Sequence, residues 1–123
     1  MQKFWKIVLL SFCLLSADMA FADKLAHEAN KAFRKIGISP SQTEPYAVQY
    51  EKYLKSRNMA VRRVLNKSAG GEVSVKARKA VNRAAKRAVK KMKGILTEQQ
   101  LKYYEEYLLA ANKVFLRDSG LRH

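Results

Sequence analysis

Few residues of this 123-residue chain have types and spacings suited to catalysis. Neither histidine, His27 or His123, has a second histidine, a cysteine or a carboxylate at metal-ligand spacing. The neighbouring carboxylates Glu105 and Glu106 would point about 100° apart on a helix, unlike a cooperating acid–base pair. The sequence also lacks a glycine-rich phosphate loop and the HExxH and CxxC motifs. We therefore expect a non-enzymatic protein with no catalytic residues, no metal and no cofactor.

Positive charge is the strongest feature, since the formal net charge is +15. Between Lys52 and Lys93 there are fifteen lysines and arginines and one acid, Glu72. The flanking segments 23–51 and 94–123 each carry four basic and four acidic residues. Charge concentrated in this way favours a selected binding surface over a general drift toward basic composition.

Residues 74–93 are predicted to form the helix that presents this charge. Apolar residues recur at steps of three and four and make one narrow stripe: Ala77, Val81, Ala84, Ala88 and Met92. The helix would be about 30 Å long, and no acidic residue interrupts it. The predicted partner-binding residues, here called the cationic ridge, are Arg62, Arg63, Lys76, Lys79, Arg83, Lys86, Arg87, Lys90 and Lys93. The expected partner is acidic or polyanionic.

Three further segments are predicted to be helical: 23–36, which Gly37 would stop, 45–67, which Pro45 would open, and 98–117. The apolar face of 45–67 is expected to contain Tyr46, Tyr50, Tyr53, Leu54, Arg57, Val61, Val64 and Leu65. A reversal at 68–72 makes this helix and 74–93 an antiparallel hairpin. The predicted fold is all-α: a small antiparallel bundle of three main helices plus a short N-terminal helix.

The six tyrosines lie in the N-terminal halves of 45–67 and 98–117. In an up-down-up bundle these helices are parallel, so we expect one aromatic cluster near the C-terminal end of helix 74–93. It would be either wall material whose hydroxyls reach water, or an aromatic surface that grips apolar peptides or stacks on bases. The predicted aromatic surface comprises Tyr46, Tyr50, Tyr53, Tyr103, Tyr104 and Tyr107.

The start of the last helix is marked by a structural cap. Thr97 as N-cap and Gln100 three residues later fit a capping box, and Leu96 can pair with Leu101 in a hydrophobic staple around it. The glycine at position 94 ends the preceding helix. We therefore expect Leu96, Thr97 and Gln100 to have a structural role.

Residues 1–22 are typical of an export signal. Lys3 and Lys6 precede the apolar run 7–15, and Ala20-Phe21-Ala22 fits a cleavage site after Ala22. Cys13 lies within the apolar run, and the bulky Phe12 before it argues against lipidation. The expected products are a signal peptide, 1–22, and one helical domain, 23–123, in the periplasm or outside the cell. An N-terminal membrane anchor is the alternative.

The segment Leu96-Thr97-x-x-Gln100, in a basic, helical chain with these export features, resembles the LTxxQ motif of the periplasmic Spy/CpxP family. The resemblance implies a small stress-related protein that forms a cradle-shaped dimer and binds non-native proteins without ATP. The family usually carries the motif twice. Here the only other segment with some similarity is Ser39-Pro40-Ser41-Gln42.

Two binding functions follow from the sequence. The first is a chaperone-like or stress-adaptor module that binds non-native or acidic proteins through the cationic ridge and the tyrosines. The alternative is a binder of an anionic polymer or envelope surface: nucleic acid, lipopolysaccharide or anionic phospholipid. A homodimer is expected in either case, because an alanine stripe buries little apolar area in so short a chain.

Overall fold

A computed structural model describes residues 24–67 and 72–120 of the chain. Within these residues there are four α-helices and one 3-10 turn, and no strand: α2 (Lys24–Ile36), η1 (Pro40–Gln42), α3 (Thr43–Lys67), α4 (Val73–Lys91) and α5 (Glu98–Asp118). The predicted all-α class is confirmed. The predicted signal peptide lies outside the described residues. None of the described helices is both long and apolar enough to cross a membrane.

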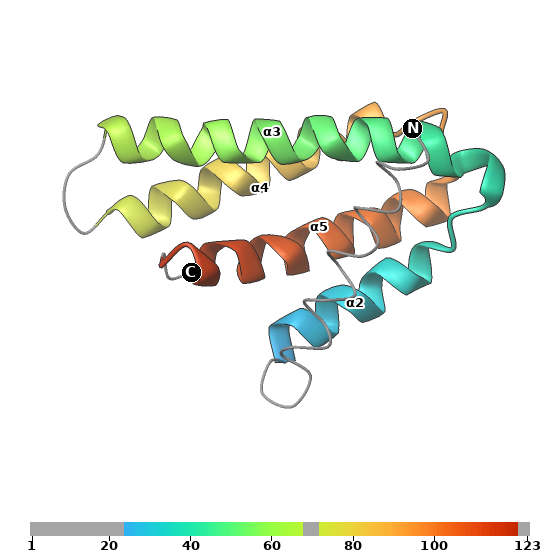
Figure 1. Cartoon of the computed structure of the whole chain (residues 1–123), viewed down its shortest axis with the longest axis horizontal. Coiled ribbons are helices and arrows are strands. Elements are labelled where there is room, and N and C mark those ends of the chain that lie inside the picture. The colour runs from blue at the N-terminus through green and yellow to red at the C-terminus, as the bar shows by residue number, and fades with distance from the viewer. Residues whose placement is uncertain (1–23, 68–71, 121–123) are drawn as a thin grey trace.

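The helices form two packed pairs (Figure 1), and all four contribute to one large cluster of buried residues. α3 and α4 make the predicted antiparallel hairpin, and α2 lies antiparallel along α5. α4 also packs against α5 and joins the two pairs. α3 and α5 run in the same direction, as the up-down-up arrangement predicts.

Local signals set the helix ends to within two residues of the predictions. Gly37 and Gly94 have φ values of +62° and +90°, which glycine adopts more readily than other residues, and each follows the end of a helix. α3 begins at Thr43, two residues before Pro45. α4 ends at Lys91, so the prediction that Lys93 belongs to the cationic helix was wrong: Lys93 lies in the turn before α5.

The core is built on the predicted stripe of α4. Ala77, Val81, Ala84, Ala88 and Met92 are all buried, together with Ala85. Small side chains at these positions let α4 approach both α3 and α5 closely. The predicted core position Leu65 was wrong, because its side chain is 51% exposed near the end of α3.

Candidate functional site

The cationic ridge is exposed to solvent, but it faces two different ways. All nine predicted residues are exposed. Arg63 of α3 and Lys76, Arg83 and Arg87 of α4 line a groove between these helices. The others lie outside that groove; three of them, Lys79, Lys86 and Lys90, follow one another along α4 at helical spacing and are here called the crest lysines.

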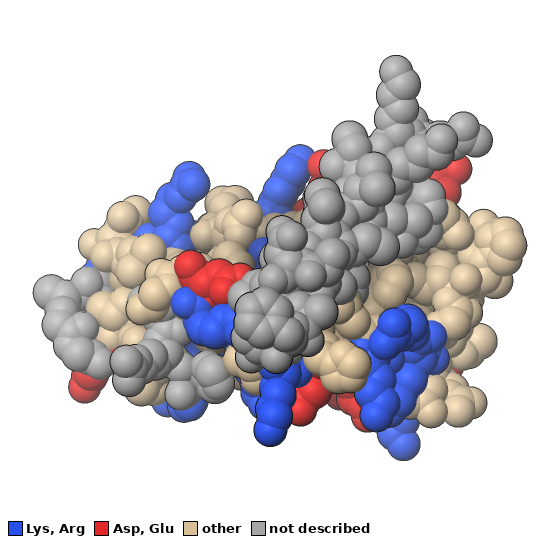
Figure 2. Space-filling view, turned by 60° about the horizontal axis from the view of Figure 1, so that its bottom comes forward, with Lys and Arg blue, Asp and Glu red and all other residues tan. Residues whose placement is uncertain are grey.

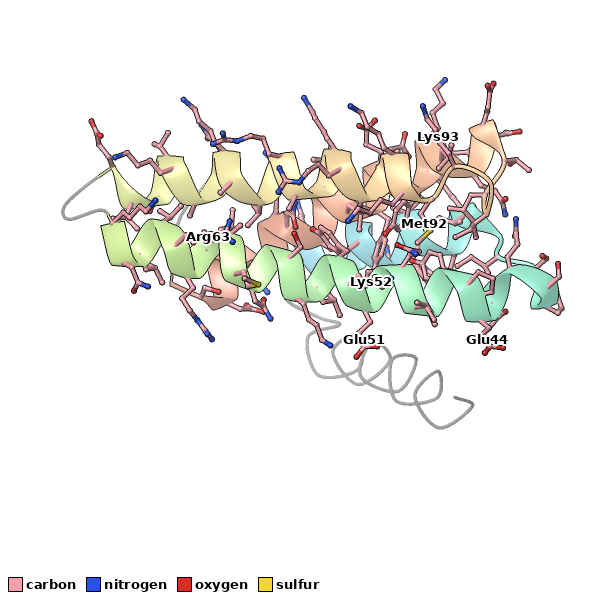
Figure 3. All side chains as sticks on the ribbon, turned by 90° about the horizontal axis from the view of Figure 1, so that it is seen from above. Glu44, Glu51, Lys52, Arg63, Met92 and Lys93 are labelled. Atoms are coloured by element: carbon pink, nitrogen blue, oxygen red, sulfur yellow. The ribbon has the colours of Figure 1, made fainter. Side chains whose placement is uncertain are left out.

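The groove between α3 and α4 has a volume of about 570 Å³. Ala60, Val64 and Ala80 supply its apolar lining, and its cations come from both helices: Arg63, Lys67, Lys76, Arg83 and Arg87. Viewed from above, Arg63 points into the space between the two helices (Figure 3). The packing of α3 beside α4 therefore brings five positive charges together around one groove with an apolar lining.

A smaller depression of about 30 Å³ lies farther along the same helix pair. Arg87 lines both hollows, and Lys52 and Lys91 add two more cations. The seven basic residues that line the two hollows are called the cationic groove: Lys52, Arg63, Lys67, Lys76, Arg83, Arg87 and Lys91. The sequence prediction missed Lys52, Lys67 and Lys91. For Lys52 and Lys67 the signal was their spacing with Ser56, Ala60 and Arg63, which puts these residues on one side of α3.

Carboxylates are largely kept away from the cationic groove. Among the described residues its one ion pair is Lys76 with Glu72, 3.9 Å apart and with both side chains mostly exposed, and such pairs contribute little. Glu44 and Glu51 point to the side of α3 away from α4 (Figure 3), where Glu51 lies 3.8 Å from Lys55. By contrast, Figure 2, turned toward the α2 and α5 side, shows acidic and basic side chains interspersed.

The predicted aromatic surface is wrong as a surface, although the cluster exists. Tyr46, Tyr50, Tyr53, Tyr104 and Tyr107 are at most 8% exposed, and Tyr103 is half-buried. The cluster packs around Ala84, Ala88, Met92 and Leu96 near the C-terminal end of α4, as predicted. The tyrosines are buried because rings from α3 and α5 pack against each other across the core. The ring centroid of Tyr46 lies 5.6 Å from that of Tyr104, edge-on, and 5.7 Å from that of Tyr50, with the rings stacked. Five of the six tyrosines are therefore part of the core and form no exposed aromatic surface.

Hydrogen bonds satisfy some of these buried hydroxyls and leave others unpaired. The Tyr50 and Tyr107 hydroxyls lie 2.8 Å apart, and Tyr53 donates to the Oδ1 of buried Asn112. Asn112 Nδ2 donates in turn to the Val81 carbonyl at 3.2 Å. The hydroxyls of Tyr46 and Tyr104 have no partner among the described residues.

Burial also changes the acidity of this cluster. Loss of solvent raises the pKa of the hydroxyls of five tyrosines above the usual value of 10: Tyr46, Tyr50, Tyr53, Tyr104 and Tyr107. The positive charge of Arg57 lowers the pKa of Tyr53, but it does not outweigh the effect of burial. These tyrosines are therefore neutral in the folded protein at ordinary pH.

The predicted cap at Leu96, Thr97 and Gln100 is present and does more than start α5. Gln100 N donates to Thr97 Oγ1 at 3.2 Å, and Thr97 N donates back to Gln100 Oε1 at 3.0 Å. Gln100 Nε2 also reaches the carbonyl of Ile36 at 3.1 Å. Leu96 is buried in the hydrophobic cluster that contains the tyrosines, and Leu101 packs against that cluster.

A second turn of similar sequence lies directly against this cap. Ser39 N donates to Gln42 Oε1 at 3.0 Å, which matches the bond at Thr97. The amides of Gln42 and Gln100 pair with each other through two hydrogen bonds of 2.8 and 2.9 Å, and Gln42 Nε2 also donates to the Ile95 carbonyl at 2.9 Å. The two helix connections are thus fastened to each other through their glutamines.

Comparisons of this chain with protein-family models, with curated proteins and with solved structures gave no match. Within residues 24–67 and 72–120 no group of three or more histidine, cysteine or carboxylate side chains is placed to hold a metal ion.

Proposed function

We propose that this chain is an exported, non-enzymatic, chaperone-like or stress-adaptor protein whose cationic groove binds acidic, non-native polypeptide segments. The observation that carries the proposal is that seven cations of α3 and α4 line two neighbouring hollows between these helices, five of them the larger one, and that carboxylates hardly neutralise them. Charge of this kind attracts acidic partners and orients them. The apolar strip of Ala60, Val64 and Ala80 gives an unfolded segment a place for its apolar side chains.

The choice of a polypeptide over a single-stranded nucleic acid depends on the position of the aromatic rings. Single strands are held by bases stacked on aromatic side chains. Five of the six tyrosines are buried, and none of the described residues that line the larger hollow of the cationic groove is aromatic. The paired turns give additional support, because Ser39 N donates to Gln42 Oε1 as Thr97 N donates to Gln100 Oε1, and the two turns lie against each other. A second turn of this kind favours the resemblance to the Spy/CpxP family, which usually carries the LTxxQ motif twice.

Two variants with equal loss of charge test the groove. The first replaces Arg63, Arg83 and Arg87 with glutamine, and the second replaces the crest lysines with glutamine. We expect the groove variant to lose most of its suppression of aggregation of an acidic protein unfolded by reduction, measured by light scattering at two salt concentrations. The crest variant should keep most of it. Equal losses in the two variants, or a larger loss in the crest variant, would contradict the groove as the binding site.

The second candidate function is binding to an anionic envelope surface or polymer, which the crest lysines favour. Lys79, Lys86 and Lys90 are exposed outside the groove and present charge to a flat surface. Each lysine near an anionic membrane contributes about 1 kcal/mol. This function predicts binding to vesicles that contain anionic lipid, or to DNA, with steep salt dependence and with greater weakening in the crest variant than in the groove variant.

A further inference from the structure

A separate cavity of about 280 Å³ lies between α2, α3 and α5, away from the cationic groove. Its lining is mostly apolar and comes from all three helices: Ala26 and Ala29 of α2, Tyr50 and Leu54 of α3, and Tyr107, Ala111, Val114 and Phe115 of α5. Ligand sites of proteins are mostly apolar and begin at about 300 Å³, so this volume suits a small, slender molecule.

Among the described lining residues one is a cation, Arg57, and its packing holds it in place. The guanidinium carbon of Arg57 lies 3.8 Å from the ring centroid of Phe115 and 5.9 Å from that of Tyr53. A guanidinium above an aromatic face is attracted by the ring and loses little further freedom when it binds an anion. The charge is therefore fixed at the wall of the cavity before any ligand arrives.

Arg57 interacts with the Tyr53 hydroxyl, but this contact does not use all of its hydrogen-bond donors. Its Nε is buried and has no acceptor among the described residues. Asp118 is the only carboxylate among the described lining residues, and it lies 3.0 Å from the guanidinium of Arg117 instead. A buried donor without an acceptor is destabilising, and a carboxylate can accept two parallel bonds from a guanidinium.

We propose that this cavity binds the carboxylate of a medium-chain fatty acid. Arg57 pairs with the carboxylate, and the acyl chain lies on Leu54, Ala111 and Val114. An inorganic anion would leave the apolar lining unused, and a neutral alkyl chain would offer the Arg57 guanidinium no acceptor. The site is independent of the proposed groove function, because no cavity residue lines the cationic groove.

The test is a titration of the full chain with decanoate below its micelle concentration, followed by NMR of the methyl groups of Leu54, Ala111 and Val114. Decanoate should shift these signals at saturable concentrations, whereas acetate should not shift them and decan-1-ol should bind at least about tenfold more weakly. Arg57→Gln should weaken decanoate binding about tenfold, the loss expected for a charged hydrogen bond. Arg63→Gln in the cationic groove removes the same charge and should leave decanoate binding unchanged.

The result that would overturn the proposal is an absence of shifts at these methyl groups, or equal decanoate affinity in the wild-type protein and Arg57→Gln. Loss of binding in Arg63→Gln would also overturn it, since the anion would then occupy the groove. Circular dichroism shows whether Arg57→Gln is folded. If it is not, Ala111→Leu keeps the charge and narrows the cavity. That variant should bind decanoate at least about tenfold more weakly, and unchanged affinity would refute the site.

Discussion

At the scale of single residues, the tyrosine hydroxyls differ more in their partners than in their burial. Tyr53 and Tyr104 are both nearly inaccessible. The hydroxyl of Tyr53 donates a hydrogen bond to the buried Oδ1 of Asn112, whereas that of Tyr104 has no partner among the described residues. The same chemical group therefore stabilises the fold at one position and opposes it at the other.

This difference predicts opposite effects of removing one oxygen atom. Tyr53→Phe leaves Asn112 Oδ1 buried without its donor, so the free energy of unfolding should fall by about 1 to 3 kcal/mol. Tyr104→Phe removes a buried hydroxyl without a partner, so the free energy of unfolding should stay the same or rise by about 1 kcal/mol. Urea denaturation of the two variants measures both values, and a destabilised Tyr104→Phe would show that this hydroxyl has a partner after all.

Burial of the tyrosines was the main error of the sequence prediction at this scale. Tyrosine is amphipathic, and its spacing on a helix gives the direction of the ring but not what lies opposite. Opposite Tyr46 and Tyr50 lie Tyr104 and Tyr107, residues almost sixty positions away. Contacts at such separation are set by helix packing, which no local pattern specifies.

At the scale of elements, the two helix connections act as one fastening. The side chain of Gln100 hydrogen-bonds to Thr97 at the start of its own helix, to the Ile36 carbonyl at the end of α2, and to Gln42 in the opposite turn. The cap itself was predictable, because a capping box depends on residues three apart. The bonds across to the other turn were not, since they need α2 and α5 to lie side by side.

The fastening predicts an unequal effect at two neighbouring glutamines. Gln100→Ala removes the side chain from all of these bonds and should lower the free energy of unfolding by about 2 to 3 kcal/mol. Gln99→Ala, at an exposed position of the same helical turn, should change it by less than about 0.5 kcal/mol. Thermal and urea unfolding of both variants gives the comparison, and similar values for the two would rule out the fastening.

The candidate site, too, has a part that the local sequence predicts and a part that depends on helix packing. The exposed charge of α4 was predictable from one helix, because a stripe of alanines fixes which side is buried. The groove was only partly predictable, since Lys52, Lys67 and Lys91 become binding candidates through the alignment of α3 beside α4. A groove between two helices forms only where they pack together, so the sequence of one helix does not predict it.

At the scale of the whole molecule, the buried tyrosines make the fold sensitive to alkali. Their pKa values are raised in the folded state, while unfolding returns them to about 10. A raised folded-state pKa means that the contribution to stability is complete below pH 10. Above pH 10 it is lost, because the unfolded chain releases protons that the folded chain retains.

We therefore predict cooperative unfolding above pH 10. Each buried tyrosine should remove about 1.4 kcal/mol of stability per pH unit in that range. Absorbance of tyrosinate and circular dichroism should change together, because these hydroxyls ionise only when the helices open. Smooth ionisation of all the tyrosines while helicity is unchanged would contradict the burial described above.

The pairing of the helices has one more consequence. α2 and α3 with the turn between them form one half of the molecule, and α4 and α5 with their turn form the other. α2 of the first half packs on α5 of the second, α4 of the second packs on α3 of the first, and the two turns meet at Gln42 and Gln100. Each half therefore completes the other, and the interface between halves does not require that both come from one polypeptide. Two chains that exchanged halves would keep these contacts, so reciprocal domain swapping offers a route to the expected homodimer that needs no new surface.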